Sequence, residues 1–388
     1  MIFEALPARF GDCLLLRVPG AGGTKLMVID GGPGTVFKDT LAPRLQMLAP
    51  SGQPLTIDAL MVSHVDADHI TGVLALLSAV QKAKIGNTKP PYKVRQLMFN
   101  SFDRLAQAVP AEVSGGAGVL KSLGASSILL GEHATQEVLA SVAQGSDLAT
   151  LAAALKVPLN PSAKGDLLFV GAKPKPFAFG EADVLVVGPR KTELDELRKE
   201  WAAWRAKKDK EALKALAAYA DKSVPNLSSI VAVVTWKGKR ILLTGDARGD
   251  YVLEGLELAG LLKKGGRLDK PLDVLKLPHH GSDRNVDNDF FERLPAHHYV
   301  ASGDGWFGNP DPGALEMIEK ARPDGKYTLH LTYSADHMDQ EHAKYLAQQK
   351  KPKAFDPKKH SVKPVLSRLD KAGVAVRFGP ARIDLAQD

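Results

Sequence analysis

The sequence is poor in cysteine, with a single thiol, Cys13, in 388 residues. One cysteine cannot form a disulfide within the chain, and it excludes zinc sites that are built from several thiolates. Cys13 lies in an apolar stretch, where we expect it to be a small buried residue on a strand.

Long apolar runs are also missing, because no uninterrupted stretch reaches the length that spans a membrane. Residues Met1 to Glu4 enter a strand pattern directly, without the basic and apolar segments of a signal peptide. We therefore expect a cytoplasmic protein with no membrane contact. A composition of 44% hydrophobic and 24% charged residues fits one large globular domain with insertions, or two domains.

The chain does contain a dense polar cluster in residues 63–72. Four side chains that can bind metals lie within six positions: His64, Asp66, Asp68 and His69. The apolar run 57–62 predicts a buried strand before the cluster, and residues 72–77 predict the start of a helix after it. A loop between a strand end and a helix start is a common place for a site in an α/β protein.

Two interpretations of this cluster are open. Asp66 and Asp68 could be surface carboxylates, one of which caps the helix. However, two histidines and two aspartates this close together destabilise the chain through carboxylate repulsion unless a cation lies among them. We therefore predict that this loop binds metal.

Three other predicted strands end in polar residues of the same kind, at Asp30, at Asp246 and at His279 with His280. Side chains from several strand ends on one rim of a layered sheet can build an open metal site on a rigid scaffold. Imidazoles and carboxylates without thiolates favour zinc, manganese or iron. One carboxylate such as Asp246 can bridge two ions about 3.5–4 Å apart. Asp30 could be a turn residue only, but we favour a role as the hydrogen-bond acceptor that orients a histidine.

These motifs, in this order, resemble those of the metallo-β-lactamase superfamily: Asp-Gly-Gly from Asp30, His-x-Asp-x-Asp-His from His64, Gly-Asp-Ala from Gly245 and Pro-His-His-Gly-Ser from Pro278. The resemblance implies an α/β fold, the αββα sandwich, in which two β-sheets face each other and helices lie outside. Asp66 stands where a second histidine is usual. This residue and the last two motifs resemble the ComEC-type branch, which includes the nuclease domain of competence DNA-uptake proteins.

The resemblance also implies how the chain is divided. A hydrolase domain covers residues 1–340 and includes an enlarged, mainly helical insertion at 102–225. Residues 341–388 form a basic C-terminal extension with a predicted last strand at 373–378.

The resemblance further implies a site for two divalent metal ions, zinc or manganese. Site one uses His64, Asp66 and the bridging Asp246. Site two uses Asp246 and these residues: Asp68, His69 and one of His279 and His280. The superfamily usually adds a histidine to site one, and the matching residue here is Asn226. Because an amide oxygen is a weak ligand, this difference favours manganese or magnesium over zinc, or leaves site one partly filled.

The reaction implied is hydrolysis by a metal-activated water. Asp68 is expected to orient the water as a general base, and Ser282 or the non-ligating member of His279 and His280 is expected to stabilise developing negative charge. We expect an anionic phosphodiester substrate, with nucleic acid as a candidate, because the net charge is +7 and residues 350–363 are rich in lysine. The lysine-rich segment could instead be a solvated basic segment without a ligand. The alternative functions are a hydrolase of a small ester, lactone or thioester, and a non-catalytic metal-binding module.

Overall fold

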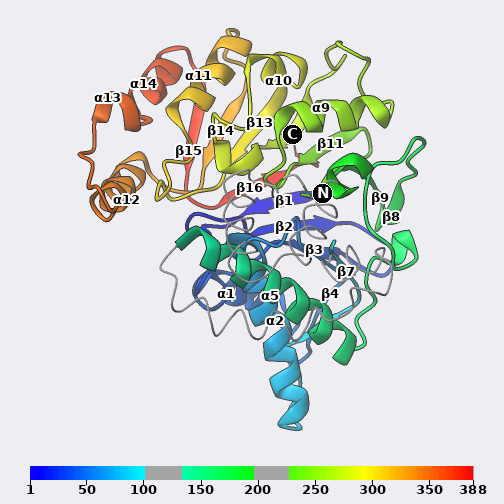
Figure 1. Cartoon of the computed structure of the whole chain (residues 1–388). Coiled ribbons are helices and arrows are strands. Elements are labelled where there is room, and N and C mark those ends of the chain that lie inside the picture. The colour runs from blue at the N-terminus through cyan, green and yellow to red at the C-terminus, as the bar shows by residue number, and fades with distance from the viewer. Residues whose placement is uncertain (101–132, 196–225, 227, 388) are drawn as a thin grey trace.

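Two β-sheets face each other in the centre of the molecule, and helices cover the outer face of each sheet (Figure 1). The computed structural model describes residues 1–100, 133–195, 226 and 228–387. This arrangement confirms the α/β fold class and the αββα sandwich that the sequence motifs imply.

The first sheet contains the N-terminal strands of the chain. Its strands, in spatial order, are β16 (Ala381–Asp384), β1 (Ile2–Ala5), β2 (Leu14–Val18), β3 (Lys25–Ile29), β5 (Ala59–Met61) and β7 (Leu97–Met98). β1 and β2 form an antiparallel hairpin, whereas β3 and β5 run parallel. The carboxyl ends of β3 and β5 therefore lie at the same edge of the sheet, and Asp30 and His64 follow these two ends.

The second sheet is larger and mostly parallel. Its strands, in spatial order, are β15 (Ala375–Phe378), β14 (Thr328–Leu331), β13 (Ala296–Ala301), β12 (Leu272–Lys276), β11 (Lys239–Leu243), β10 (Val231–Trp236), β9 (Ala182–Gly188) and β8 (Phe177–Phe179). Strands β11 to β15 are parallel, so the loops after β11 and β12, which carry Asp246 and His279, emerge on one rim. A small third sheet pairs β4 (Leu55–Ile57) with β6 (Tyr92–Val94).

The helices lie on both outer faces of the sandwich (Figure 1). The first sheet is covered by α1 (Ala42–Leu48), which continues a π-helical turn η1 (Phe37–Leu41), and by α2 (Ala67–Ile85) and α5 (His133–Ala154). The second sheet is covered by α9 (Gly249–Leu258), α10 (Asn288–Arg293), α11 (Pro312–Ala321) and α14 (Lys363–Lys371). Beyond its β15 edge lie α12 (Ala335–Ala347) and α13 (Pro357–His360). Two short 3₁₀ turns are η4 (Pro161–Ala163) and η5 (Pro278–Gly281).

Apolar side chains fill three layers, one between the sheets and one between each sheet and its helices. Successive residues of a strand point to opposite faces. On β2, Leu14 and Leu16 therefore face the second sheet, while Leu15 packs under the helices. The same alternation places Val274 of β12 between the sheets and Leu275 under the helices. Because both faces of these strands are buried, the strands are continuous apolar runs in the sequence.

The C-terminal residues are built into the sandwich. The domain boundary expected at residue 340 falls inside α12. β15 joins the second sheet beside β14, and β16 pairs with β1 in the first sheet. Residues 341–388 therefore supply a strand to each sheet.

The helical insertion expected at 102–225 lies partly outside the described residues, at 101–132 and 196–225. Within the described part, α5 is helical, as expected. β8 and β9, however, belong to the second sheet and pair with β10 at its end, so residues 177–188 are part of the sandwich.

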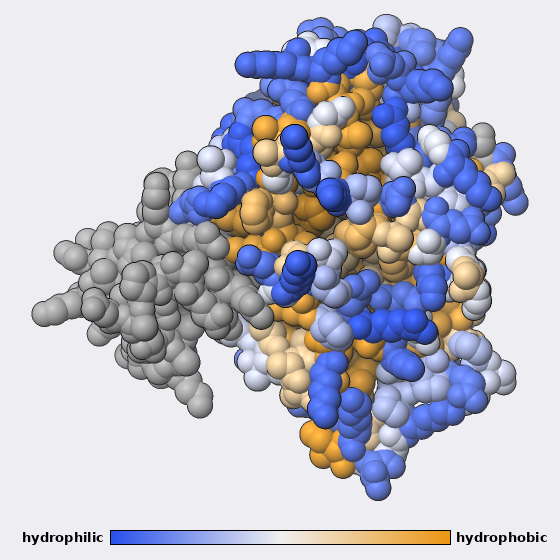
Figure 2. Space-filling view, turned by 90° about the vertical axis from the view of Figure 1, so that its right-hand side faces the viewer, coloured by the Kyte–Doolittle hydropathy of each residue, from blue (hydrophilic) through white to orange (hydrophobic). Residues whose placement is uncertain are grey.

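No described helix combines the length and the apolar character that crossing a membrane requires. On the side of the molecule where β8 and β9 lie, hydrophobic side chains form a band between hydrophilic ones (Figure 2).

Candidate metal centre

The polar residues lie on loops at one rim of the sandwich, where glycines allow two backbones to approach closely. A Cβ atom on Gly72, near the start of α2, would lie 1.9 Å from the carbonyl oxygen of Gly31. The amide of Gly31 donates to the carbonyl oxygen of His69 at 2.8 Å. Only glycine fits this contact. It holds the first turn of α2 against the loop that carries Asp30.

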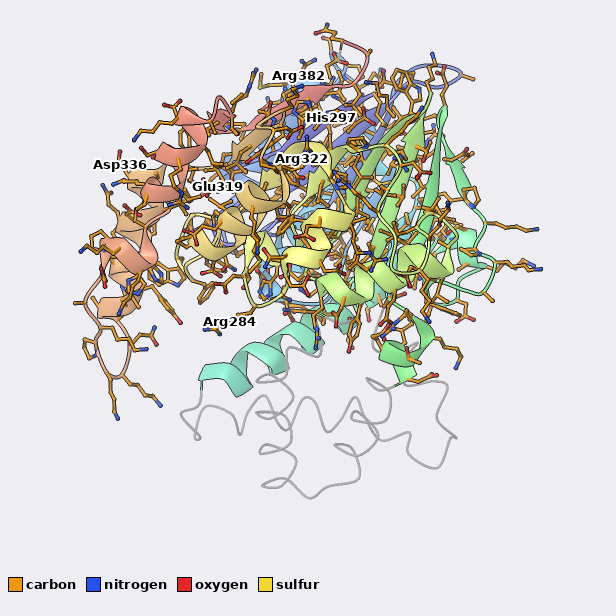
Figure 3. All side chains as sticks on the ribbon, turned by 90° about the horizontal axis from the view of Figure 1, so that it is seen from above. Arg284, His297, Glu319, Arg322, Asp336 and Arg382 are labelled. Carbon is orange, nitrogen blue, oxygen red and sulfur yellow. The ribbon has the colours of Figure 1, made fainter. Side chains whose placement is uncertain are left out.

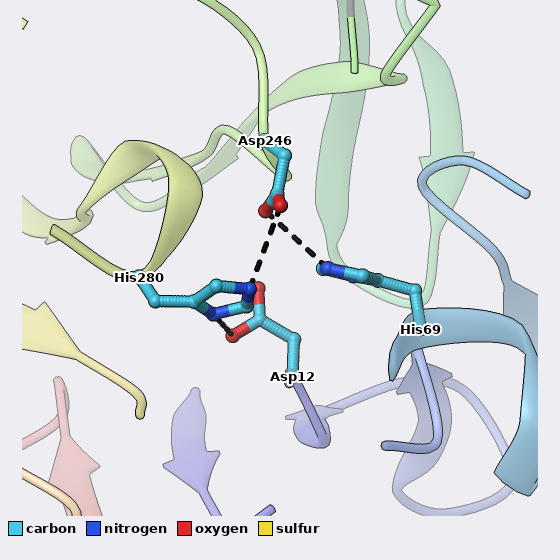
Figure 4. A group of neighbouring side chains, drawn as sticks. All are labelled: Asp12, His69, Asp246 and His280. Atoms are coloured by element: carbon cyan, nitrogen blue, oxygen red, sulfur yellow. Dashed lines mark ion pairs between the residues drawn. The ribbon is translucent and has the colours of Figure 1, made fainter. Parts of the chain in front are cut away.

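The carboxylate of Asp246 is buried and faces four imidazoles. The distances from their Nε2 atoms to the nearer carboxylate oxygen are 3.9 Å for His64, 3.3 Å for His69, 3.6 Å for His279 and 3.5 Å for His280. Figure 4 shows Asp246 between the rings of His69 and His280. The structure therefore brings together loops that follow β5, β11 and β12.

The two aspartates of the opening motif occupy different positions. Asp68 lies between two rings, with its Oδ2 3.6 Å from Nε2 of His69 and 3.4 Å from Nε2 of His280. Asp66 lies beside His64, with 3.5 Å between Oδ2 and Nε2. Their side chains are 22% and 28% exposed, so both carboxylates lie at the open side of the cluster.

The adjacent histidines reach the same carboxylate because of their backbone conformation. Neighbouring residues of an extended strand point to opposite sides. Here the φ angle of His279 is 47° and that of His280 is 57°, in the left-handed region that non-glycine residues seldom adopt. The chain turns sharply after β12, and both Nε2 atoms face Asp246. Strained backbone of this kind is concentrated at functional sites.

Each of the four imidazoles also has a polar partner at Nδ1. The partners lie within 3.3 Å and are Ser63 for His64, Asp30 for His69, Asn285 for His279, and Asp12 with Ser302 for His280. A carboxylate can only accept a hydrogen bond, so Asp30 keeps the Nδ1 proton of His69 in place and directs Nε2 toward Asp246. Asp30 in turn accepts hydrogen bonds from the amide and the hydroxyl of Ser63, at 2.8 Å and 2.7 Å.

A buried ion pair lies behind His280. Nζ of Lys276 is 2.8 Å from Oδ2 of Asp12, and the two side chains are 0% and 1% exposed. Asp12 also lies 3.3 Å from Nδ1 of His280 and accepts a hydrogen bond from the hydroxyl of Ser302. Burial raises the pKa of Asp12, but Lys276 and His280 overcome this effect and hold the pKa well below its ordinary value. Asp12 is therefore a carboxylate anion.

Four buried groups could surround an ion by themselves, because ligand atoms of Asp12, His69, Asp246 and His280 all lie within 4.8 Å of one another (Figure 4). Asp12, however, faces the Nδ1 side of His280, and Lys276 already neutralises its charge. Asp68 faces the Nε2 side of the same ring. We therefore regard Asp12 as the residue that orients His280, and Asp68 as the better ligand.

The cluster fits metal ions because its converging atoms have no other partners. The Nε2 atoms of His64, His69 and His280, and Oδ1 of Asp246, are buried without a hydrogen bond to any described residue. Buried polar atoms without partners destabilise a fold. Imidazole nitrogens and carboxylates are the donors that divalent transition metals take. The residues therefore fit a site for divalent metal ions, and His64, His69, His280 and Asp246 would hold them.

The carboxylates favour positive charge at this point. Burial lowers the pKa of His69, but Asp246 and Asp68 raise it by more, so that it lies well above its ordinary value. Burial likewise lowers the pKa of His280, and Asp246 and Asp12 raise it well above the ordinary value. Because a metal ion competes with protons for the same lone pairs, a cluster that attracts protons also attracts a cation.

The structure places Asn226 and Ser282 beside the cluster. Nδ2 of Asn226 is 3.5 Å from Nδ1 of His279, on the opposite side of the ring from the atom that faces Asp246. The side chain of Ser282 hydrogen-bonds Asp311. Asn226 therefore contacts one of the histidines and is not among the groups around Asp246.

Sequence reasoning missed Asp12, Lys276, Asn285 and Ser302. The contacts of Asp12 are long-range, since Asp12 and Ser302 lie 290 residues apart in the chain. Asn285 lies only six residues from His279 but is an ordinary loop residue in the sequence. One signal was present: Lys276 interrupts an apolar strand, and a lysine inside a buried strand needs an anionic partner.

The fold and the cluster together define an α/β sandwich with a histidine- and aspartate-rich site on one rim. Residues 6–141 match the family model Lactamase_B, the metallo-beta-lactamase superfamily. The matched segment contains His64 to His69 and ends before Asp246. The match supports the superfamily that the motifs resemble, and it does not distinguish the ComEC-type branch.

Among solved structures, the crystal structure of CmlA, a diiron beta-hydroxylase from Streptomyces venezuelae, is similar to this chain. The alignment has 12% sequence identity and a TM-score of 0.39, and it covers 99% of this chain and 54% of that chain. This chain thus spans about half the length of that protein. No protein among the curated sequences matches the chain.

Proposed function

We propose that the protein is a metal-dependent hydrolase that holds two divalent cations, zinc or manganese, around Asp246. The observation that carries this proposal is the convergence of three buried, unpaired imidazole nitrogens on one buried carboxylate. Asp246 would serve both sites. Site one would also use His64, Asp66 and His279, and site two would also use Asp68, His69 and His280.

In this assignment His279 takes the position that the motif resemblance implies for Asn226. Nε2 of His279 lies 3.6 Å from Asp246, whereas Asn226 approaches the Nδ1 side of the same ring. Asn285 then holds His279 in place, because its Oδ1 accepts a hydrogen bond from Nδ1 of the ring, and Asn226 lies beside the same nitrogen. Both members of the histidine pair become ligands, one for each site.

When bound, divalent cations lower the pKa of water toward ~7 and so supply a nucleophile at neutral pH. The remaining work belongs to the side chains. Asp68, which is 22% exposed between His69 and His280, is placed to accept a hydrogen bond from that water. Asp30 and Asp12 keep the rings of His69 and His280 oriented, so the site needs little rearrangement when substrate binds.

The proposed substrate is an anionic phosphodiester. A cleft beside His279 is lined by three cationic side chains, Arg248, Arg284 and Lys353, and by one carboxylate, Asp311. A cleft lined mainly by one sign of charge concentrates ligands of the opposite sign. These cations favour a phosphodiester over a neutral ester or lactone. The ComEC-type resemblance, with nucleic acid as the source of the phosphodiester, is part of the same proposal.

The test is hydrolysis of bis-p-nitrophenyl phosphate, a single-stranded oligonucleotide and a lactone by protein loaded with manganese or zinc. We expect hydrolysis of the phosphodiesters, and we expect Asp246→Asn to lower metal content and rate by at least about 100-fold, since outer partners of ligands already contribute 10–100-fold. Asp183→Asn, at an exposed position on β9, is the matched control and should keep both. Protein that binds no metal and hydrolyses none of the three would refute the proposal, and hydrolysis of the lactone alone would replace the substrate class.

A further inference from the structure

The cleft beside His279 has a volume of about 550 Å³ and lies between two segments that follow strands of the second sheet. One wall is the loop after β12, with Arg284 and Asn285. The opposite wall is α12 and the segment that follows it, with Tyr345 and Lys353. Phe307 also lines the cleft. His279 lines the cleft and also faces Asp246 at 3.6 Å, so the cleft adjoins the metal cluster.

Two of the three cations that line the cleft have no ion pair among the described residues. The side chain of Arg284 stands clear of the side chains around it in the view from above (Figure 3). Neither Arg284 nor Lys353 forms an ion pair with a carboxylate in the described part of the chain, whereas Arg248 pairs with Asp250 at 2.6 Å. The one acidic lining residue is Asp311, whose pKa is raised to about 6 by burial, so it is a carboxylate anion for the most part at neutral pH. The cleft can therefore bind an anion without first breaking an ion pair at Arg284 or Lys353.

An aromatic surface lies on the same cleft. Phe307 is 48% exposed, which is unusual for so large an apolar ring. Its ring is held edge-to-face against Tyr345, with 5.2 Å between centroids, and against Phe10, with 5.1 Å. Tyr345 also packs against Trp306, with 5.7 Å between centroids. The exposed ring is therefore fixed in position, and binding a flat ligand against it costs little side-chain entropy.

We propose that this cleft is the subsite for the non-reacting part of the substrate, and that this part carries a flat aromatic ring and a second anionic group. The ring packs on Phe307 and Tyr345, and the second anion binds Arg284 and Lys353. A nucleotide unit has both features, since it joins a planar base to phosphates. This inference rests on the proposed hydrolase function, and it specifies which phosphodiesters the metal cluster receives.

The test uses three phosphodiesters that share the leaving group p-nitrophenol. Apart from this shared leaving group, methyl p-nitrophenyl phosphate has neither feature. The p-nitrophenyl ester of thymidine 5′-monophosphate adds the base as a ring on the non-leaving side, and its 3′-phosphorylated form adds the second anion. We expect kcat/KM to rise by about 10-fold with the ring, the usual effect of stacking a base on an aromatic side chain. The 3′-phosphate should add about 3-fold, the effect of an exposed ion pair.

The variants assign each gain to a residue. Phe307→Ala should remove the gain from the ring, and Lys353→Ala should remove the gain from the 3′-phosphate, with the methyl ester hydrolysed as before. Phe378→Ala, at a 50% exposed phenylalanine of β15, and Lys350→Ala, at an exposed lysine, are the matched controls. Equal kcat/KM for all three substrates, or equal losses for all three in Phe307→Ala, would overturn the subsite and leave the hydrolase function intact.

A binding measurement separates the two proposals. Thymidine 3′,5′-bisphosphate, titrated by calorimetry into the metal-loaded protein, should bind about 10-fold more weakly to Phe307→Ala than to the natural protein. If no phosphodiester is hydrolysed but this dependence on Phe307 and Lys353 is found, the subsite stands and the hydrolase function fails. An oligonucleotide and a mononucleotide are then compared as competitors of thymidine 3′,5′-bisphosphate. If the oligonucleotide competes more strongly, the natural ligand of the cleft is nucleic acid, and if the two compete equally, it is a free nucleotide.

Discussion

Lys276→Met should destabilise the fold strongly, because it leaves Asp12 as a buried anion without its cation. The Lys276 side chain is 0% exposed, and its ammonium contacts Asp12 at 2.8 Å and donates to the carbonyl oxygen of Leu277 at 2.9 Å. Removing one partner of a buried ion pair typically costs about 3–5 kcal/mol. Asp12 keeps its contacts with His280 and Ser302, so we expect about 3 kcal/mol.

The double variant Lys276→Met with Asp12→Asn tests this reasoning. It removes both charges and keeps similar side-chain volumes, so most of the lost stability should return. The assay is urea unfolding of the metal-free protein, followed by tryptophan fluorescence, because bound metal would stabilise the native state and mask the difference. Metal affinity provides a second readout. An asparagine does not polarise His280 as a carboxylate does, so the double variant should bind metal about 10–100-fold more weakly than the natural protein.

Two results would refute the argument. If Lys276→Met unfolds at the same urea concentration as the natural protein, Lys276 does not stabilise the buried carboxylate of Asp12. If the double variant recovers both stability and metal affinity, Asp12 serves packing alone and does not orient His280.

Two further substitutions, His330→Gln and Gly72→Ala, test features that determine the stability of the fold. Burial, with the nearby ring of His298, lowers the pKa of His330 to about 3. Below pH ~6.5 the unfolded chain therefore binds a proton at His330 more readily than the folded chain does. The free energy of unfolding should decrease by about 2 kcal/mol as the pH is lowered from 7 to 5. His330→Gln should reduce the loss of unfolding free energy over this interval by that amount, and an unchanged loss would show that His330 is not the cause. Gly72→Ala should cost about 1–3 kcal/mol, because its methyl group would meet the carbonyl of Gly31 at 1.9 Å. Gly171→Ala, whose added Cβ meets nothing within 4 Å, is the control, and equal urea midpoints for the two variants would contradict the close contact.

The sequence predicts the residues around Asp246 well because each of them follows a strand end. An apolar run that stops at a polar cluster is a local signal, visible within ten residues of His64 or His279. Parallel pairing then gathers the strand ends on one rim: β3 lies beside β5, and β11 lies beside β12. The polar residues after each strand can thus be found locally, and parallel pairing, which is general in α/β sheets, brings them together.

The groups that hold the histidines could not be predicted in the same way. Asn285 and Ser302 are ordinary polar residues, and only the packed structure shows that they contact Nδ1 of His279 and of His280. The division of the chain into domains also depends on long-range pairing. The pairing of β16 with β1 joins the two ends of the chain, and no pattern within residues 375–384 indicates which edge the last strand will choose.

The residues at Nδ1 also divide the metal centre into two unequal halves. The rings of site two, His69 and His280, each face a carboxylate, from Asp30 and Asp12. The rings of site one face neutral groups, the hydroxyl of Ser63 for His64 and the amide of Asn285 for His279. A carboxylate at Nδ1 makes the imidazole a stronger donor at Nε2. Site two should therefore bind its ion more tightly than site one.

This asymmetry has a direct test that does not depend on activity. Calorimetric titration of the metal-free protein with manganese should show two steps, and Asp30→Asn should weaken the tighter step by about 10–100-fold. Asn285→Asp makes the opposite change, since it places a carboxylate 2.9 Å from Nδ1 of His279, and it should tighten the weaker step by about 10-fold. A single step with two equal ions, unaffected by either substitution, would mean that the partners at Nδ1 do not set metal affinity. Two steps that neither substitution changes would instead assign the weaker binding of site one to Asp66, the carboxylate that stands in place of the usual second histidine.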